Sequence, residues 1–188
     1  MFEKIYCINL NHRTERWEES EKEFKRIGWE VERFGTTTDF NNSQYRCLQE
    51  AKQYNSSLIL EDDVCFGSLN HLDNSYSELP EDWDIISLGA NLREEHTERI
   101  GGNLYRYTNG WTTHAMGYSK KMVEWILENF NPEKDIVYDE WLRINVLPFF
   151  NCYIVYPMVA FQRPSYSDLM GMFADYTEIF ETSKSMFK

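Results

Sequence analysis

Long apolar runs are missing from this sequence of 188 residues. No stretch approaches the roughly 18 consecutive apolar residues that mark a membrane-spanning helix. The first residues lead directly into an apolar segment, Lys4–Leu10, without the pattern of a secretory signal peptide. We therefore expect no membrane span, and the missing signal predicts a cytoplasmic protein.

Positive charge is also scarce. The chain has 19 Lys and Arg against 31 Asp and Glu, which gives a formal net charge of −12. Such a charge repels nucleic acid and anionic membrane surfaces, so neither is an expected partner. Any anionic ligand must be met locally, by a metal ion or by a few placed basic residues.

Cysteines are few and scattered, at Cys7, Cys47, Cys65 and Cys152. No two of them form a CxxC pair, and none is grouped with a histidine. A disulfide framework or a zinc site is therefore not expected. The simpler interpretation is four reduced thiols, most of them buried.

An acidic cluster is the most informative feature that the sequence does contain. Leu58, Ile59 and Leu60 are typical of a strand buried on both faces, and Glu61, Asp62 and Asp63 follow at once. Unpaired buried carboxylates are costly, so the strand must end at a surface or at a cation. A solvated turn and a divalent-metal site are both consistent with this spacing.

The first half of the chain alternates strands and helices, which predicts an α/β fold with parallel strands. Thr14 and Ser43 are expected helix N-caps, and Gly28 is an expected helix end. The expected elements are a strand at Lys4–Leu10, a helix at 14–27, a strand at 29–34, a helix from 43 to about 54, and a strand at 58–60.

The second half is less regular. Residues 91–100 are polar and lack periodicity, which predicts a mobile loop. Ser119 is an expected N-cap, and His114 is expected to be a structural residue inside a strand. The other expected elements are strands at 85–89, 104–107, 112–118 and 152–156, and helices at 119–130, 141–146 and 172–187.

Five segments, taken in order, resemble the glycosyltransferases of family 25, the lipooligosaccharide and collagen galactosyltransferases. The resemblance covers roughly residues 5–170, and it departs from the family pattern at 34–37 and 45–50, on the expected acceptor side. The segments are 8–16 with Arg13 and Arg16, 58–64, 82–89, 115–121 and 157–168.

This resemblance implies a single GT-A-like domain over 1–188, with a Rossmann-like nucleotide-binding half and a mixed, largely parallel sheet flanked by helices. The donor half would span about 1–90, and the acceptor half with the C-terminal helix about 91–188. It also implies an inverting transfer of a hexose, galactose or glucose, from a UDP-sugar, with Mn²⁺ or Mg²⁺. The acceptor would be a hydroxyl of a saccharide or of a hydroxylated protein.

The resemblance also assigns binding residues. Glu61, Asp63 and Asp168 are the expected metal ligands, with oxygen atoms that suit a hard cation. The alternative for Arg16 is a surface charge that pairs with Glu19. The expected contacts to the donor nucleotide are Asn9, Leu10, Arg13, Arg16, Glu61, Asp62 and Gln162.

An inverting transfer needs a base that takes the proton of the acceptor hydroxyl. Asp139 and Glu140 are the candidates, with Asp139 preferred, because they are adjacent carboxylates on a segment far from the metal cluster. The alternative is structural: Asp139 would be a helix N-cap and Glu140 a favourable first-turn charge.

Two other functions stay open. One is a catalytically inactive GT-A-like domain that binds a carbohydrate or a protein. The other is a nucleotide-sugar pyrophosphorylase, which also uses acidic metal ligands. That class usually has a glycine-rich phosphate loop near its N-terminus, and residues 9–14 contain no glycine.

Overall fold

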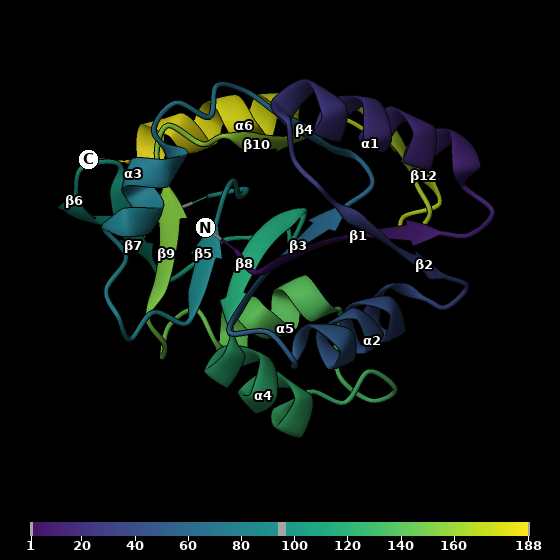
Figure 1. The fold of residues 1–188 in the computed structure, drawn as a ribbon, viewed down its shortest axis with the longest axis horizontal. Coiled ribbons are helices and arrows are strands. Elements are labelled where there is room, and N and C mark those ends of the chain that lie inside the picture. Colours follow the sequence, from purple (N-terminus) through teal and green to yellow (C-terminus); the bar gives the residue numbers. More distant parts are fainter. Residues whose placement is uncertain (1, 94–96, 188) are drawn as a thin grey trace.

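The structure is a computed structural model that describes residues 2–93 and 97–187. A central sheet lies between two layers of helices (Figure 1). One layer holds α1 (Thr14–Ile27), α3 (Leu72–Ser77) and α6 (Thr177–Ser183), followed by the short 3₁₀ helix η1 (Lys184–Met186). The other layer holds α2 (Phe40–Ala51), α4 (Lys120–Asn129) and α5 (Tyr138–Asn145).

The described residues form a mixed central sheet in the order β2-β1-β3-β8-β5-β9-β7-β6. The pairings run β2, β1, β3, β5, β9 and β6 in one direction and β8 and β7 in the other, which confirms the predicted α/β class. Its strands are β1 (Lys4–Leu10), β2 (Glu32–Thr36), β3 (Ser56–Glu61), β5 (Ile85–Ser87), β6 (Thr97–Gly101), β7 (Leu104–Tyr107), β8 (Ala115–Ser119) and β9 (Cys152–Val155).

Two small ribbons lie outside this sheet. β4 (Val64–Phe66) pairs with β10 (Ala160–Gln162), and β11 (Ser165–Ser167) pairs with β12 (Met172–Ala174), both antiparallel. The first ribbon continues the chain directly from the acidic end of β3. Residues far apart in sequence are thereby brought beside the acidic cluster.

Two predicted helix N-caps are wrong. Helix α1 begins at Thr14 itself, with Arg13 at the N-cap and no side-chain cap. Helix α2 begins before Ser43, because the Asp39 carboxylate accepts a hydrogen bond from the Asn42 N–H at 3.0 Å. The predicted cap at Ser119 is confirmed, since its hydroxyl accepts from the Met122 N–H, and Gly28 ends α1 with φ of 73°.

The tail and the 91–100 segment also differ from expectation. Residues 97–101 form β6 rather than a loop, and residues 94–96 lie outside the described part of the chain. The single helix expected over 172–187 is instead β12, α6 and a 3₁₀ turn. Gly171, with φ of 65°, makes the turn that lets β12 pair with β11.

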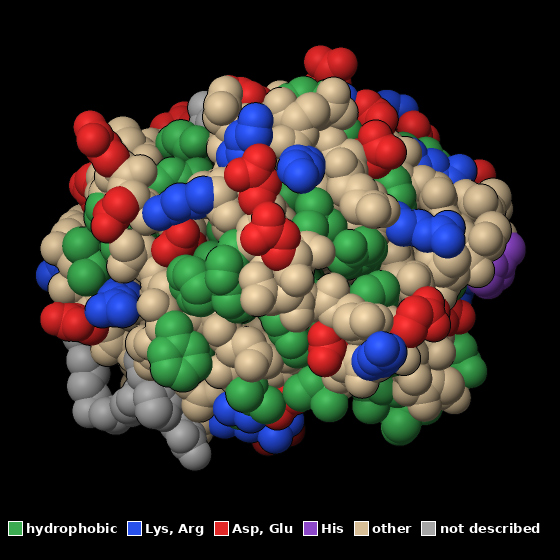
Figure 2. Space-filling model, turned by 90° about the horizontal axis from the view of Figure 1, so that it is seen from below, with side chains coloured by type: hydrophobic (Ala, Val, Ile, Leu, Met, Phe, Trp, Pro, Cys, Tyr) green, Lys and Arg blue, Asp and Glu red, His purple; other side chains and the backbone are tan. Residues whose placement is uncertain are grey.

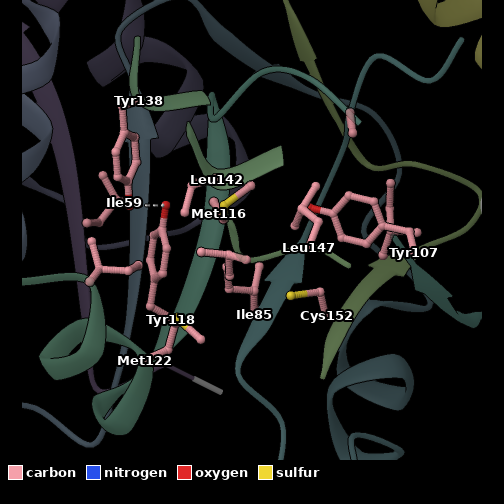
Figure 3. Close-up of a cluster of buried hydrophobic side chains, with 14 of the residues drawn as sticks. Ile59, Ile85, Tyr107, Met116, Tyr118, Met122, Tyr138, Leu142, Leu147 and Cys152 are labelled. Atoms are coloured by element: carbon pink, nitrogen blue, oxygen red, sulfur yellow. Dashed lines mark hydrogen bonds between the residues drawn. The ribbon is translucent and has the colours of Figure 1, made fainter. Parts of the chain in front are cut away.

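The core fills both faces of the sheet. On the face of α2, α4 and α5, the hydroxyl of Tyr138 donates to that of Tyr118 at 3.2 Å, among Ile59, Met116 and Leu142 (Figure 3). This pair gives each buried phenol a polar partner. The four cysteines are free and all but Cys65 are buried, as predicted.

The face of the molecule viewed in Figure 2 does not separate its charges. On the side viewed in Figure 2, acidic and basic side chains are interspersed with exposed hydrophobic ones. Within the described residues, no helix combines the length and the apolar character needed to cross a bilayer.

Candidate functional site

A cavity of about 360 Å³ opens at the carboxyl ends of β1 and β3. Ligands of open α/β sheets bind at this edge. Its walls come from β1, the β2–α2 connection, the end of β3, the segment before β8, the start of α5, and the chain from β10 to α6. The predicted site residues among its lining are Leu10, Arg16, Glu61, Asp62, Asp63, Asp139, Gln162 and Asp168.

The acidic cluster sits where β3 stops. Residues 57–60 are fully buried between β1 and β8, and the chain then turns at Asp62 and Asp63 into β4. Asp62 is 8% exposed and Asp63 is 9% exposed. The solvated-turn alternative therefore does not describe these carboxylates, which are buried at the cavity wall.

Asp62 is fully engaged by the protein. Its Oδ2 accepts from Asn9 Nδ2 at 2.6 Å, and its Oδ1 pairs with Arg16. Asn9 is buried beneath the wall, where its own oxygen accepts from Arg33 Nε at 3.0 Å. Among the described residues that line the cavity Asn9 does not appear, so the structure places it behind Asp62.

Arg16 lies in the cavity wall rather than on the surface. Its guanidinium pairs with Asp62, lies 3.4 Å from Asp63 Oδ2, and donates to the Tyr166 carbonyl at 2.9 Å. The predicted alternative, a pair with Glu19, does not occur; Glu19 lies 3.4 Å from Arg163 instead. Arg16 is thus a cation placed directly against the acidic cluster.

Glu61 and Asp63 are neighbouring carboxyls; Asp63 is buried and Glu61 is partly buried. Burial raises the pKa of Glu61, and the neighbouring Asp63 charge raises it further. Burial also raises the pKa of Asp63, while the Arg16 guanidinium lowers it. Thr113 Oγ1 donates to Glu61 Oε1 at 2.7 Å. Positive charge brought close to this pair would stabilise its ionised form.

Two side-chain oxygens at this place have no hydrogen-bond partner within residues 2–93 and 97–187. They are Asp63 Oδ1 and Gln162 Oε1, both buried, and Gln162 Nε2 donates to Asp63 Oδ2 at 3.4 Å. Carboxylate and carboxamide oxygens are ligands that hard divalent cations prefer. The described residues contain no group of three or more acidic, His or Cys side chains that could hold a metal alone. These residues therefore fit a divalent cation whose remaining coordination positions are filled by a bound ligand.

Asp168 and Arg13 are brought together, but away from that pair. Asp168 lines the cavity, and its Oδ2 accepts from Arg13 Nη1 at 2.5 Å. Arg13 also donates to Glu15 at 2.6 Å and is not among the described lining residues. These contacts tie the β11–β12 ribbon to the start of α1.

The two candidate bases separate clearly. Asp139 lines the cavity, and burial raises its pKa. Glu140 does not appear in the described lining; it accepts from Trp111 Nε1 at 2.9 Å and from Arg143 Nε at 2.7 Å, and the Arg143 bond lowers its pKa. The alternative interpretation of Asp139 as a helix N-cap is wrong, because α5 begins at Tyr138 with Val137 at the cap.

Several lining residues escaped sequence reasoning. Thr112 has a positive φ of 77°, a strained conformation for a β-branched residue, next to the Glu61 partner Thr113. Tyr176 and Gln44 also line the cavity. The sequence pattern around the acidic cluster did not indicate these residues, because each of them reaches the cavity through tertiary packing. His114 is fully buried, with its Nδ1 3.1 Å from Thr112 Oγ1. The predicted place inside a strand is wrong, because His114 comes just before β8.

Comparisons with known proteins show the fold. No protein-family model and no curated protein matches the chain. A glycosyltransferase involved in the glycosylation of the major capsid of PBCV-1 is similar in structure, with 12% identity, a TM-score of 0.50, and 97% of this chain and 99% of that chain covered. A197 from STIV is similar over 85% of each chain, with 10% identity and a TM-score of 0.53. The chain therefore has a GT-A-like fold, and membership of family 25 stays a prediction.

Proposed function

We propose that this chain is a transferase that uses a nucleotide-sugar donor. In its specific form, it is an inverting, metal-dependent hexosyltransferase that moves galactose or glucose from a UDP-sugar to a hydroxyl of a saccharide or a hydroxylated protein. The observation that carries the proposal is the pair of unpartnered buried oxygens, Asp63 Oδ1 and Gln162 Oε1, at the acidic end of the cavity. A GT-A-like fold supports it.

The acidic end fits the demands of a departing diphosphate. A bound Mn²⁺ or Mg²⁺ would act as a Lewis acid toward the negative charge that develops on the leaving group. Glu61, Asp63 and Gln162 would hold that cation, and Thr113 fixes the Glu61 carboxylate through its 2.7 Å hydrogen bond. Asp168 is a weaker candidate ligand, since Arg13 already pairs with it.

Arg16 supplies a second positive charge at the same place. Its guanidinium is buried against Asp62 and Asp63, so a phosphate that enters the cavity meets a cation whose position is already set. Guanidinium groups bind phosphate oxygens through paired hydrogen bonds. Arg16 would thus position the diphosphate and offset part of its charge.

Asp139 is the proposed base. It reaches the cavity from α5, an element separate from the end of β3, and burial raises its pKa, which makes the carboxylate a better proton acceptor. Its carboxylate would take the acceptor hydroxyl's proton as that oxygen attacks the sugar. Glu140 holds Trp111 and Arg143 and would keep α5 in place.

A second candidate has its own supporting observation. Arg16 already pairs with Asp62 and Asp63, which partly neutralises the cluster without a metal. A catalytically inactive GT-A-like domain that binds a carbohydrate or a protein would be consistent with such pairing.

Thermal stabilisation by ligands separates the two candidates. A ligand that binds only the folded chain at 100 times its Kd adds about 2.7 kcal/mol of stability. We expect UDP to raise the melting temperature, and manganese to increase this rise. No response to UDP, with or without manganese, would contradict the transferase and favour the binding domain. Turnover of UDP-galactose and UDP-glucose then identifies the sugar.

A further inference from the structure

Gln44 is a cavity residue that the chemistry above does not use. It lies in the first half of α2, is 1% exposed, and lines the cavity. In the described part of the chain, neither its Nε2 nor its Oε1 has a hydrogen-bond partner. A buried carboxamide with both groups unmet is destabilising in the free protein, so its presence calls for a ligand.

The polar side chains around Gln44 satisfy one another. The Ser43 hydroxyl lies 3.1 Å from the hydroxyls of both Thr36 and Thr38. The Asp39 carboxylate accepts from the backbone and the side chain of Asn42, at 3.0 and 2.9 Å. Among the described residues of this wall, Gln44 still offers both a donor and an acceptor.

The two unpartnered groups of Gln44, Nε2 and Oε1, define the chemistry of the ligand that would satisfy them. A fully ionised phosphate accepts hydrogen bonds but donates none, so it cannot satisfy Gln44 Oε1. A planar group with an N–H beside a C=O satisfies both carboxamide atoms at once. Ile8, Leu10 and Phe40 line the same cavity and offer apolar contacts of the kind that the faces of such a ring need.

We propose that Gln44 binds the base of the nucleotide, through an edge that carries adjacent donor and acceptor groups. For uracil, Nε2 would donate to a ring carbonyl and Oε1 would accept from the ring N–H. This inference rests on the proposed function. It assigns the base to Gln44 on α2, whereas the proposed function assigns the diphosphate to the acidic cluster at the end of β3.

Calorimetry with two probes tests the assignment, both titrated with manganese present. UDP carries the base, and inorganic pyrophosphate lacks it. Gln44→Met keeps the size of the side chain and removes both polar atoms; we expect UDP to bind at least about tenfold more weakly and pyrophosphate to bind as before. Gln49→Met, on the exposed face of the same helix, is the matched control and should change neither affinity.

Melting of the free protein provides an independent measurement. Because Gln44→Met removes an unsatisfied buried amide, the variant should melt about 2–4 °C higher than the parent while it binds UDP less well. A side chain with only a structural role would lower the melting temperature. Gln44→Leu repeats the test with a second apolar side chain of similar size.

Three results would overturn the inference. The first is an unchanged UDP affinity in Gln44→Met, which would leave the transferase proposal standing. The second is an equal loss for UDP and pyrophosphate, which would indicate general damage to the cavity. The third is a loss for galactose 1-phosphate but not for UDP, which would assign Gln44 to the sugar. Failure of the parent to bind UDP at all would instead contradict the proposed function itself.

Discussion

Buried carboxylates lie at opposite ends of the strands of the central sheet, and they differ in how many of their oxygens have hydrogen-bond or ion-pair partners. Asp84 lies just before β5, is 6% exposed, and has both oxygens engaged: Oδ2 accepts from the Asn151 N–H at 2.8 Å, and Oδ1 lies 3.1 Å from Lys121 Nζ. Asp63 lies just after β3, is 9% exposed, and has one oxygen without a partner in the described residues.

The difference shows that burial alone does not mark a functional acid. Asp84 sits at the amino end of its strand, where it joins the β5 and β9 segments and leaves nothing for a ligand. The buried phenols of Tyr118 and Tyr138 follow the same rule, since they bond to each other (Figure 3). The feature that indicates ligand binding is a buried oxygen without a hydrogen-bond partner at the carboxyl end of a strand.

The neighbours Asp139 and Glu140 offer the largest test of this contrast. Asp139→Asn should reduce turnover by about 10²–10⁴-fold with UDP affinity nearly intact, because it removes the proton acceptor. Glu140→Gln is the matched control, and it should turn over within a few-fold of the parent because Glu140 is engaged by Trp111 and Arg143. If the two variants exchange these results, Glu140 is the base.

Asp63→Asn tests the unmet oxygen directly. The change keeps the size of the side chain and removes a charged ligand, so UDP binding in manganese should weaken by at least ~1.4 kcal/mol, about tenfold. The melting temperature should change little. Calorimetry that finds the same UDP affinity as in the parent would exclude Asp63 from the site.

Asp84→Asn tests the buried carboxylate whose two oxygens both have partners. The asparagine can still accept from Asn151 but loses the charge that strengthens this bond and the Lys121 pair, at a cost of roughly 1 kcal/mol of folding free energy. Urea denaturation should detect this loss, and UDP affinity should be unchanged. A clear fall in UDP affinity would mean that the two edges of the sheet are coupled.

His114 provides the smallest effect and a test by pH. Burial lowers its pKa to about 4 from 6.5, and its ring contacts Phe180 and Thr112. The unfolded chain binds the proton more readily, so this contribution to stability is present above about pH 6.5 and is lost as the pH falls toward about 4. Between about pH 7.5 and 6 the loss should be below ~1 kcal/mol. His114→Gln should show a shallower decline; an identical slope would contradict this account.

Sequence reasoning reached the strands and the acidic cluster because both depend on local patterns. Lys4–Leu10 is a continuous apolar segment, and the structure confirms its bounds. The start of α2 could not be decided locally, since Asp39 and Ser43 are both suitable caps. Tertiary contacts settle it: Ser43 bonds to Thr36 and Thr38, which leaves Asp39 at the helix start.

The candidate site was predicted in part for the same reason. Arg16 and Asp63 follow strand ends, which the sequence can locate, and both line the cavity. Gln44 gave no such signal, because its defining property is the absence of partners in the folded, described chain. Glu140 and Asp139 are adjacent in sequence, and only the course of α5 decides which of them faces the cavity.

The bonds of Arg13 to Asp168 and of Arg16 to the Tyr166 carbonyl join the start of α1 to a ribbon that is made much later during translation. The ribosome releases the β1–β3 region first, with Asp62 and Asp63 already at its edge. The wall that holds Gln162, Asp168 and Tyr176 is made about 100 residues later. A nascent chain that ends before this wall has the acidic cluster but no enclosed cavity, so the cavity forms only after Gln162, Asp168 and Tyr176 have been made.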